Sequence, residues 1–351
     1  CALPILDTAQ WEKRVGKEHA HLATFYDIGG QDIVRAVHSQ QPYPIKGGYV
    51  LGGNPVMTWA DSKSTATALA KLDFLVVTDY FMTPTAMLAD IVLPAATYLE
   101  VSGVSIDADD NVFYVPQLID AHECKSDMEI INSIGNAMGY EKYFWPEMDA
   151  FWDALLAPYN ITLAQLKEIG TLNNKEPLPV YQPGTYRKNG FPTDNGKIAL
   201  FSKTLASQGV APLPEYKPLH GKSKEYPYYC TNYKSIHYYH SAGRQIKAHR
   251  LKEDKAIAYV SSDIAAKENI AEGDTIVIET PVGKVLHQAS LTRQVAPNTV
   301  VTAHGWWYPE EENNPFHLKA CINNLTSPEE NLGHDIPAFS CRGMSCRVYK
   351  D

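Results

Sequence analysis

The sequence lacks the features that mark several large classes of protein. It has no run of Lys and Arg, and its 40 acidic residues outnumber its 31 basic ones, whereas a nucleic-acid surface needs clustered positive charge. No apolar stretch approaches the roughly 20 residues that a membrane-spanning helix needs. The phosphate-binding GxxxxGK[ST] loop is absent as well, which argues against a P-loop nucleotide-binding protein. We therefore expect no nucleic-acid partner and no direct insertion into a membrane.

Cysteines are few and widely spaced. The six cysteines form no CxxC pair, and Cys341 and Cys346 have no second pair with which to complete a zinc site. We expect reduced or buried thiols, and the redox compartment stays open. The chain begins with Cys1 rather than methionine and has no positively charged, apolar leader, so we expect a processed form or a fragment.

The most informative stretch lies in the first third of the chain. The apolar run 74–77 is closed by the polar residues Thr78 and Asp79, which is typical of a strand buried on both faces. A threonine and a proline at 83–84 suit the first turn of a short helix. A second apolar strand is expected at 91–94. This order predicts a parallel βαβ unit, whose ligands lie beyond the carboxyl ends of the strands, here at Thr78 and Asp79.

A similar strand end lies upstream. The strand-like run 48–51 is followed by Gly52-Gly53-Asn54-Pro55, where paired glycines let a ligand approach the backbone and an asparagine side chain both donates and accepts. Alone, such a sequence is most often a plain turn, and an aspartate at a strand end is most often a helix cap. Because the two strand ends are expected side by side, we infer a nucleotide site there, with candidate residues Gly53, Asn54, Thr78 and Asp79.

From Tyr226 onward the pattern changes to short strands separated by turns. We expect strands at 228–231, 256–260, 275–280, 284–286 and 299–303, with a hairpin tip at 281–283. Short, closely spaced strands favour a small closed barrel. The preceding residues 171–225 are rich in proline, glycine and lysine, and we expect them to be a linker. At 351 residues the chain is long enough for two domains with separate cores.

Both regions resemble one known family. GGNP, then DFLVVTDYFMTPTAMLADIVLPAATYLE, then KENIAEGDTIVIETPVGKV and PNTVVTAHGWWYPE are similar, in this order, to the molybdopterin oxidoreductases of the dimethyl sulfoxide reductase type. The resemblance implies an α/β fold class with three parts. A partial parallel-sheet dinucleotide-binding domain spans 1–170, a linker spans 171–225, and a six-stranded double-psi β-barrel domain spans 226–351. Since such enzymes are longer, this chain is expected to be the C-terminal portion of one.

The resemblance also implies a cofactor and partners. The cofactor is bis-molybdopterin guanine dinucleotide carrying molybdenum or tungsten. The family's N-terminal cysteine motif for an iron–sulfur cluster and its metal ligand match nothing here, so we expect them in a missing part and name no catalytic residue or metal ligand. Implied partners are the rest of the catalytic subunit, an iron–sulfur electron-transfer subunit and a small-molecule substrate, in the cytoplasm or periplasm of a prokaryote with anaerobic metabolism.

One candidate contact to the guanine is Asp127. Ser126 or Asp127 suits the N-cap of an amphipathic helix, which is the structural interpretation. The resemblance instead implies an aspartate near the guanine, whose pairing edge presents two N–H donors that one carboxylate accepts. Asp79 competes for this role.

The barrel supplies the other candidates. Its first loop, 231–237, matches the place where the family holds one arm of the cofactor, and hydroxyls, amides and a cation suit phosphates and pterin edges. His237 and His240 form an HxxH pair, but no further ligand pair lies nearby, so a pterin contact or a core role is favoured over zinc. The candidates from this loop are Thr231, Lys234 and His237.

Three more candidates follow along the chain. Trp307 either stacks on a flat heterocycle or packs in the core. Asn324, of the pair at 323–324, resembles the family's asparagine that faces the pterin. Arg342 either binds a phosphate through its guanidinium or lies exposed to solvent.

The substrate is not predicted. HGWWYPE and NNLTSPE resemble the branch that holds acetylene hydratase and catechol dehydroxylases, while thiosulfate and polysulfide reductases stay open. Beside the redox enzyme stand two alternatives, which are a non-redox hydratase or transhydroxylase of the same family and a non-catalytic cofactor-binding or assembly module.

Overall fold

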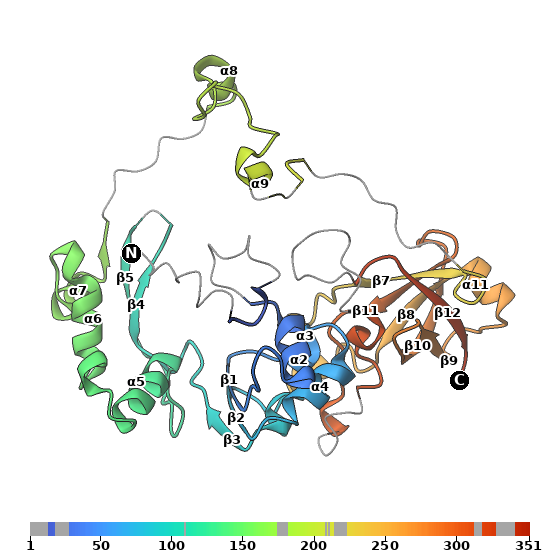
Figure 1. Ribbon diagram of the computed structural model, residues 1–351, viewed down its shortest axis with the longest axis horizontal. Helices are drawn as coiled ribbons and strands as arrows, with labels where there is room; N and C mark the ends of the chain where they lie inside the picture. The colour runs from blue at the N-terminus through green and yellow to red at the C-terminus, as the bar shows by residue number, and fades with distance from the viewer. Residues whose placement is uncertain are drawn as a thin grey trace. The chain divides into compact units, whose positions relative to one another are not determined.

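The computed structural model describes residues 13–17, 28–108, 110–173, 182–207, 209, 211–213, 223–311, 318–327 and 341–351. The chain divides into two compact units (Figure 1). The first comprises Cys1–Val77, Phe81–Val92 and Ser202–Asp351, and the second comprises Thr78–Tyr80 and Leu93–Phe201. Every helix in the described ranges is too short or too polar to cross a lipid bilayer. The predicted division at 170 and 225 stays a prediction.

A three-stranded parallel sheet organises the N-terminal part, with the strand order β1-β2-β3. The predicted βαβ unit is confirmed. Its strands are β1 (Gly47–Leu51), β2 (Phe74–Asp79) and β3 (Ile91–Pro94). The connecting elements are α3 (Pro55–Thr58), α4 (Ser62–Leu69) and the 3-10 turn η2 (Ala86–Leu88), and α2 (Gly30–Ser39) precedes the sheet.

Local sequence explains where these elements begin. Pro55 occupies the first turn of α3, where its missing N–H costs no hydrogen bond. The Asp61 side chain accepts a hydrogen bond from the Ser64 N–H at 3.0 Å and caps α4. Thr83 Oγ1 accepts from the Ala86 N–H at 3.2 Å, but the short helix η2 begins after Thr85, two residues later than an N-cap at Thr83 would place it.

Strand β2 is not buried on both faces along its whole length: the prediction fails at Phe74, whereas Val77 and Thr78 are both buried at the end of the strand. Leu75 and Val77 are 1% and 0% exposed, whereas Phe74 is 48% exposed. Successive side chains of a strand point to opposite faces. Helices α3 and α4 cover the face of Leu75 and Val77 in a shared hydrophobic cluster, and the opposite face is more open in the described part of the chain.

The second unit is built around a small antiparallel sheet. Strand β4 (Gly103–Ile106) pairs with β5 (Val112–Val115), which also pairs with β6 (Thr171–Leu172). Val112, Leu156, Leu163 and Leu166 form its core. Its helices are α5 (Asp127–Ala137), η3 (Glu141–Tyr143), α6 (Met148–Leu156), η4 (Ala157–Tyr159), α7 (Leu163–Ile169) and α8 (Thr185–Asn189).

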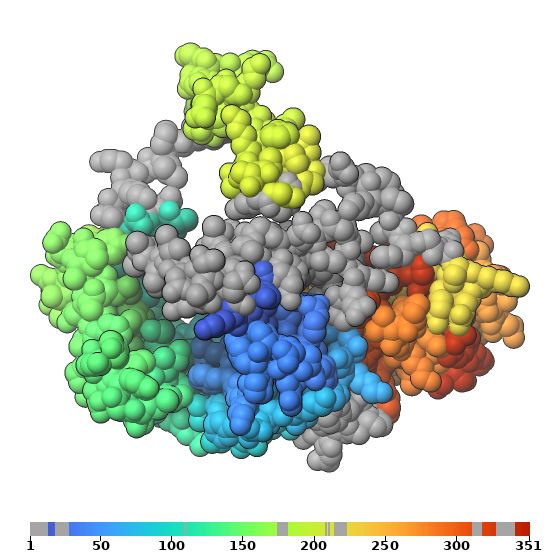
Figure 2. Space-filling model, viewed as in Figure 1, coloured from blue at the N-terminus to red at the C-terminus, as the bar shows by residue number. Residues whose placement is uncertain are grey.

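The predicted closed six-stranded barrel is confirmed, with the strand order β10-β8-β11-β7-β12-β9. Coloured yellow to red, its described residues form one block (Figure 2). The strands are β7 (Tyr228–Tyr233), β8 (Ile257–Ser261), β9 (Thr275–Glu279), β10 (Lys284–Thr292), β11 (Thr299–Ala303) and β12 (Met344–Lys350). The remaining helices of the first unit are α9 (Lys203–Ser207), α10 (Lys247–Arg250), α11 (Ser262–Lys267), η5 (Pro309–Glu311) and η6 (Ile322–Leu325).

Strand β10 is longer than the predicted 284–286. Its first half pairs antiparallel with β9 across the predicted hairpin tip, and its second half pairs in parallel with β8. A strand that changes partners carries no turn residue at the change, so the sequence did not reveal its second half.

Within the first unit, η6 joins the barrel to the α/β segment. The Asn323 side-chain amide donates to the Met57 carbonyl of α3 at 2.9 Å. Ser62 and Cys321 are hydrogen bonded at 3.3 Å. Trp307, Leu318 and Cys321 complete the hydrophobic cluster that covers β2.

Candidate functional site

Buried nitrogen atoms without a hydrogen-bond partner among the described residues are concentrated in two segments, 244–250 and 304–306. They are Nε and Nη1 of Arg244, Nε2 of Gln245, Nδ1 of His249, Nη1 of Arg250, Nδ1 of His304 and Nε1 of Trp306. Apart from the imidazole nitrogens, whose role depends on the tautomer, all are donors. Since buried polar groups are nearly always paired in folded proteins, this set indicates a ligand rich in acceptor oxygens or negative charge. We call these two segments the clamp.

Arg244 lies at the centre of the clamp and is only 1% exposed. Its guanidinium lies 3.7 Å from the ring centroid of Tyr238 and 4.0 Å from that of Trp306. Burial lowers its pKa to about 10, so the side chain stays charged at neutral pH. Nη2 donates to three backbone carbonyls at 3.3 to 3.5 Å, those of His240, His304 and Gly305.

A pair of histidines lies beside this arginine. Nδ1 of His240 is 3.2 Å from Nε2 of His304, so one of these nitrogens donates and the other accepts. Burial lowers the pKa of His304 below its ordinary value, and the charges of His240, Lys234 and Arg244 lower it further. His304 is therefore a neutral imidazole at neutral pH.

The loop that carries Arg244 is held by Glu253. Its carboxylate accepts hydrogen bonds from the hydroxyls of Tyr233 and Ser235, and its backbone carbonyl accepts from the hydroxyl of Tyr238. Burial raises the pKa of Tyr233 above its ordinary value, and the charge of Glu253 raises it further, so this phenol stays a donor. The loop is thus fixed from β7 to the end of α10.

The predicted residues of the first barrel loop lie at the edge of the clamp. Thr231 is on β7, and its carbonyl accepts from the Thr302 hydroxyl at 3.2 Å. Lys234 is exposed and contributes to the pKa of His304. The His237 N–H donates to Ser235 Oγ at 3.0 Å. In the described ranges no group of three or more metal-ligating side chains occurs, so His237 and His240 gain no support as a zinc pair.

The other barrel candidates differ in what their side chains do. Asn324 donates to the Leu318 carbonyl at 2.7 Å, while its buried Oδ1 has no partner among the described residues. Trp307 is 3% exposed, donates to the Ser241 carbonyl at 2.8 Å and packs in the cluster over β2, as its core interpretation requires. Arg342 lies exposed before β12. Cofactor contacts of all three stay predictions.

At the end of β1, Gly53 and Asn54 lead into α3. Asn54 Oδ1 accepts from the Thr85 hydroxyl at 2.7 Å, and Thr85 Oγ1 accepts from the Val56 N–H at 3.2 Å. The predicted strand-end residue is therefore tied to the turn that follows β2. Because η6 contacts α3 through Asn323, the Asn54 and Asn324 segments belong to neighbouring elements of the first unit.

In the second unit, Asp127 lines a hollow of about 340 Å³ together with Tyr80, Tyr98 and Trp152. Ser126, not Asp127, is the N-cap of α5 and forms a capping box with Glu129.

Burial raises the pKa of Tyr80, and the charges of Asp127, Asp79 and Glu100 raise it further, so these carboxylates lie near one phenol. Thr78 is buried and precedes Asp79 on β2. Carboxylates beside aromatic rings suit a base with N–H donors.

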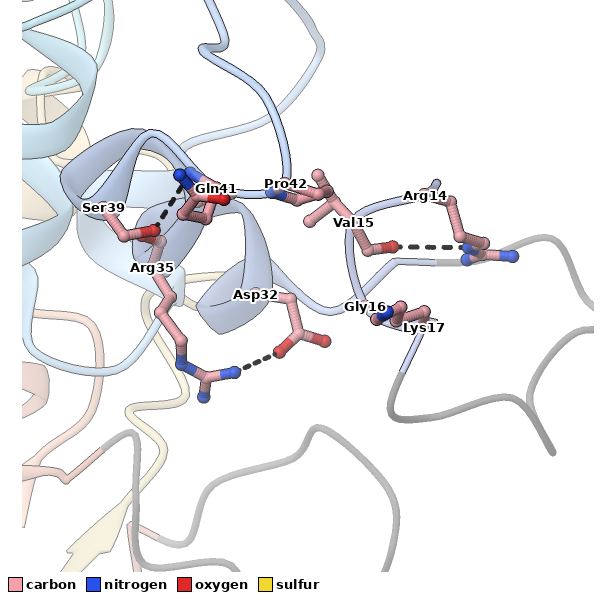
Figure 3. Close-up of a pocket in the computed structure, with 10 residues that line it drawn as sticks. Arg14, Val15, Gly16, Lys17, Asp32, Arg35, Ser39, Gln41 and Pro42 are labelled. Carbon is pink, nitrogen blue, oxygen red and sulfur yellow. Dashed lines mark hydrogen bonds and ion pairs between the residues drawn. The ribbon is translucent and has the colours of Figure 1, made fainter. Parts of the chain in front are cut away.

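A further hollow in the first unit, of about 290 Å³, is lined by Arg14, Lys17, Asp32 and Arg35 (Figure 3). Arg35 points toward the carboxylate of Asp32, with Nη1 and Oδ1 2.9 Å apart. Arg14 Nε donates to the Val15 carbonyl at 3.3 Å. Three cations and one carboxylate line this hollow, and one of the cations is paired with that carboxylate.

Comparison with known families identifies the two regions. The family model described as "Molybdopterin oxidoreductase" matches residues 7–137, and the one described as "Molydopterin dinucleotide binding domain" matches residues 228–341. The chain belongs to the molybdopterin oxidoreductase family. The clamp lies within the residues that the dinucleotide-binding model matches, as does β11, the strand that precedes His304.

Relatives of this molybdopterin oxidoreductase chain include enzymes with different activities. Acetylene hydratase from Syntrophotalea acetylenica is 27% identical over 322 residues, covering 87% of this chain and 43% of the relative. The F420-dependent formate dehydrogenase subunit alpha from Methanocaldococcus jannaschii is 29% identical over 290 residues, covering 80% of this chain and 40% of the relative. The chain therefore spans about two fifths of the length of these relatives.

A solved structure shows the same fold. Acetylene hydratase from Pelobacter acetylenicus superposes with a TM-score of 0.79 at 23% identity, covering 98% of this chain and 50% of that chain. At this identity the likeness concerns the fold alone.

The family matches imply a bis-molybdopterin guanine dinucleotide cofactor with molybdenum or tungsten. The residues fit parts of this group. Phosphate and pterin oxygens suit the unpaired donors of Arg244 and Trp306, and a guanine edge suits the carboxylates near Tyr80. In each unit, the residues fit the cofactor in the type of hydrogen-bonding group that they offer.

Arg244, His304 and Trp306 were missed from the sequence. The resemblance directed attention to 231–237 and to the second tryptophan of the pair, whereas the unpaired indole N–H belongs to the first. One signal was present, since Arg244 is the only Lys, Arg, Asp or Glu in the run 235–246.

Proposed function

We propose that this chain is the C-terminal, cofactor-binding part of a molybdenum- or tungsten-dependent oxidoreductase that uses bis-molybdopterin guanine dinucleotide. Its metal ligand and iron–sulfur cluster lie in the remainder of the protein. The observation that carries the proposal is the set of unpaired buried donors around Arg244, inside the region matched by the dinucleotide-binding model.

The chain's own residues bind and orient. Arg244 offers Nε and Nη1 to a phosphate or pterin oxygen, with Trp306 Nε1 and the Asn324 side chain beside other parts of the ligand. Asp79 and Asp127 accept the N–H groups of guanine in the second unit. The aromatic faces around Arg244 exclude water, which strengthens each polar contact. When bound, such a cofactor supplies oxygen or hydroxyl transfer and electron transfer at its metal.

The partners follow from the same proposal. Two relatives, a formate dehydrogenase subunit alpha and an assimilatory nitrate reductase catalytic subunit, are subunits by name. We therefore expect the rest of the catalytic subunit and an iron–sulfur electron-transfer subunit as partners, with a small molecule as substrate.

A non-redox hydratase or transhydroxylase is the second candidate. It is favoured by the sequence likeness to acetylene hydratase. The two functions differ in one measurable requirement. Turnover that needs no external electron donor or acceptor supports the hydratase, and turnover that stops without one supports the oxidoreductase.

The test of cofactor binding is the molybdenum, tungsten and guanine content of the purified full-length protein and of its Arg244→Met variant. Each hydrogen bond to a charged group contributes about 1.5–3 kcal/mol, so the metal content of the variant should fall by about tenfold or more. Arg244→Lys keeps the charge without the planar fork and should fall between the two. The exposed Arg293 supplies the matched control, Arg293→Met, with unchanged content.

Three results decide between the alternatives. A wild-type protein free of molybdenum, tungsten and pterin contradicts the proposed function. Pterin without metal, on a native chain of about this length by intact mass, favours the non-catalytic module. Equal metal content in Arg244→Met, with an unchanged melting temperature, contradicts the role of Arg244.

A further inference from the structure

His240 and His304 form a line of ring nitrogens that runs from the surface into the clamp. His240 is exposed, its Nδ1 lies 3.2 Å from Nε2 of His304, and Nδ1 of His304 is buried without a partner among the described residues. The fold brings the two rings together, because β7 and β11 pair in parallel and the His304 N–H donates to the Tyr233 carbonyl at 2.9 Å.

This arrangement suits the transfer of single protons. A neutral imidazole has one donor and one acceptor nitrogen, so two rings in hydrogen-bond contact conduct a proton by exchanging it between their nitrogens. The charged groups facing His304 are Lys234 and Arg244, besides His240 itself. These cations disfavour a positive charge on His304.

We propose that His240 and His304 form a two-imidazole proton relay between solvent and the ligand held in the clamp. A proton binds Nε2 of His240, the proton on Nδ1 moves to Nε2 of His304, and the Nδ1 proton of His304 passes to a basic nitrogen or oxygen of the bound heterocycle. One proton enters and one leaves, no electron moves, and proton transfer in the reverse direction restores both tautomers. The inference rests on the proposed function, since the ligand is the cofactor.

The first test measures the histidines and needs no cofactor. Hydrogen–deuterium exchange at the imidazole Cε1, followed by mass spectrometry across pH, gives the pKa of each histidine in the full-length protein. His240→Gln should raise the pKa of His304, because it removes a neighbouring ring that shares a proton. His122→Gln, at an exposed histidine of the second unit, should leave it unchanged. An unchanged His304 pKa in His240→Gln overturns the relay, whether or not the protein binds metal.

The second test measures proton movement in the holoenzyme. Proton uptake on chemical reduction is followed with a pH-indicator dye in a stopped-flow instrument. His240→Ala should slow it by about 100-fold, the lower end of what a positioned proton-transfer group contributes. Added imidazole should restore the rate, since the site of His240 is open to solvent. His304→Gln should be equally slow and should not respond to imidazole.

A purely structural role gives a different result. Metal content and melting temperature are measured for each variant, so loss of cofactor is separated from loss of proton transfer. Wild-type uptake rates in His240→Ala at full metal content contradict the relay while leaving the proposed function intact. Metal-free wild-type protein contradicts the proposed function, and the histidine titration still decides whether the pair is coupled.

Discussion

At the residue scale, His287 contrasts with the histidines of the clamp. It lies on β10 opposite Ile276, on the same face as the core residues Val285 and Ala289, and both ring nitrogens are buried without a partner among the described residues. Burial lowers its pKa to about 3. The barrel core therefore holds a neutral imidazole at neutral and mildly acidic pH.

Acid should weaken the barrel through this residue. The unfolded chain binds a proton near pH 6.5 and the folded chain only near pH 3, so stability falls as pH drops from 6.5 toward 3, by roughly 1.4 kcal/mol per pH unit. In urea unfolding, His287→Leu should lose about 2 kcal/mol less than the wild type between pH 7 and pH 5. His122→Gln should keep the wild-type dependence, and an identical dependence in His287→Leu would count against the buried imidazole.

The choice between adjacent residues was beyond the sequence. Asn323 and Asn324 carry the same amide, yet one donates to α3 and the other leaves an unpaired Oδ1. Likewise, the indole N–H of Trp306 has no partner among the described residues, whereas that of Trp307 donates to the Ser241 carbonyl. Which neighbour turns toward a ligand depends on packing between elements distant in sequence, so only the position of each pair was predictable.

At the scale of single elements, α5 separates a capping role from a binding role. Ser126 accepts from the Glu129 N–H at 3.2 Å, and the Glu129 carboxylate accepts from the Ser126 N–H at 2.8 Å. Ser126 and Asp127 both line the hollow beside Tyr80, but the Ser126 hydroxyl is engaged by Glu129 in the capping box. Adjacent residues thus serve the helix and the hollow.

Two substitutions should have opposite effects. Ser126→Ala should cost about 1 kcal/mol of unfolding free energy and leave guanine content unchanged, because only the cap is lost. Asp127→Asn should keep the stability and lower guanine content, since an amide cannot accept both N–H donors. Chemical denaturation and nucleotide release measure the two effects. A loss of guanine in Ser126→Ala at full stability would reverse the assignment.

Element types were predictable and their surroundings were not. Runs of apolar residues gave β2 and β3, and the turn at 281–283 gave the β9–β10 hairpin. The half-open face of β2 and the second partner of β10 depend on what packs or pairs beside each strand. The residues of a strand do not by themselves show which element packs or pairs beside it.

At the scale of the whole molecule, the order of two sequence blocks was enough to predict the fold class. The parallel sheet and the closed barrel were both expected, because each block carries its own turn and strand pattern. The junction through η6 was not expected. It depends on hydrogen bonds of Asn323, Cys321 and Thr326 to the α/β segment and on apolar contacts, between residues about 260 positions or more apart.

Breaking this junction should uncouple the two parts of the first unit. Asn323→Ala leaves the buried Met57 carbonyl without its donor, at a cost of about 1–3 kcal/mol. Thermal unfolding of the full-length protein should then begin at a lower temperature, with early proteolytic cleavage between the α/β segment and the barrel. Asn195→Ala, at an exposed position, is the control. A single unshifted transition in Asn323→Ala would mean that the apolar contacts suffice.

The hairpin tip at 281–283 lies against η6, which carries Asn324, a predicted cofactor contact. A Cβ atom on Gly283 would lie 2.5 Å from the carbonyl oxygen of Asn324, and Thr280 Oγ1 donates to the Leu325 carbonyl at 2.9 Å. A side chain at position 283 would have to push η6 away, and with it Asn324, a predicted cofactor contact, and Asn323, whose amide bonds α3. Selection for a cofactor would therefore act on a glycine that no cofactor atom needs to touch.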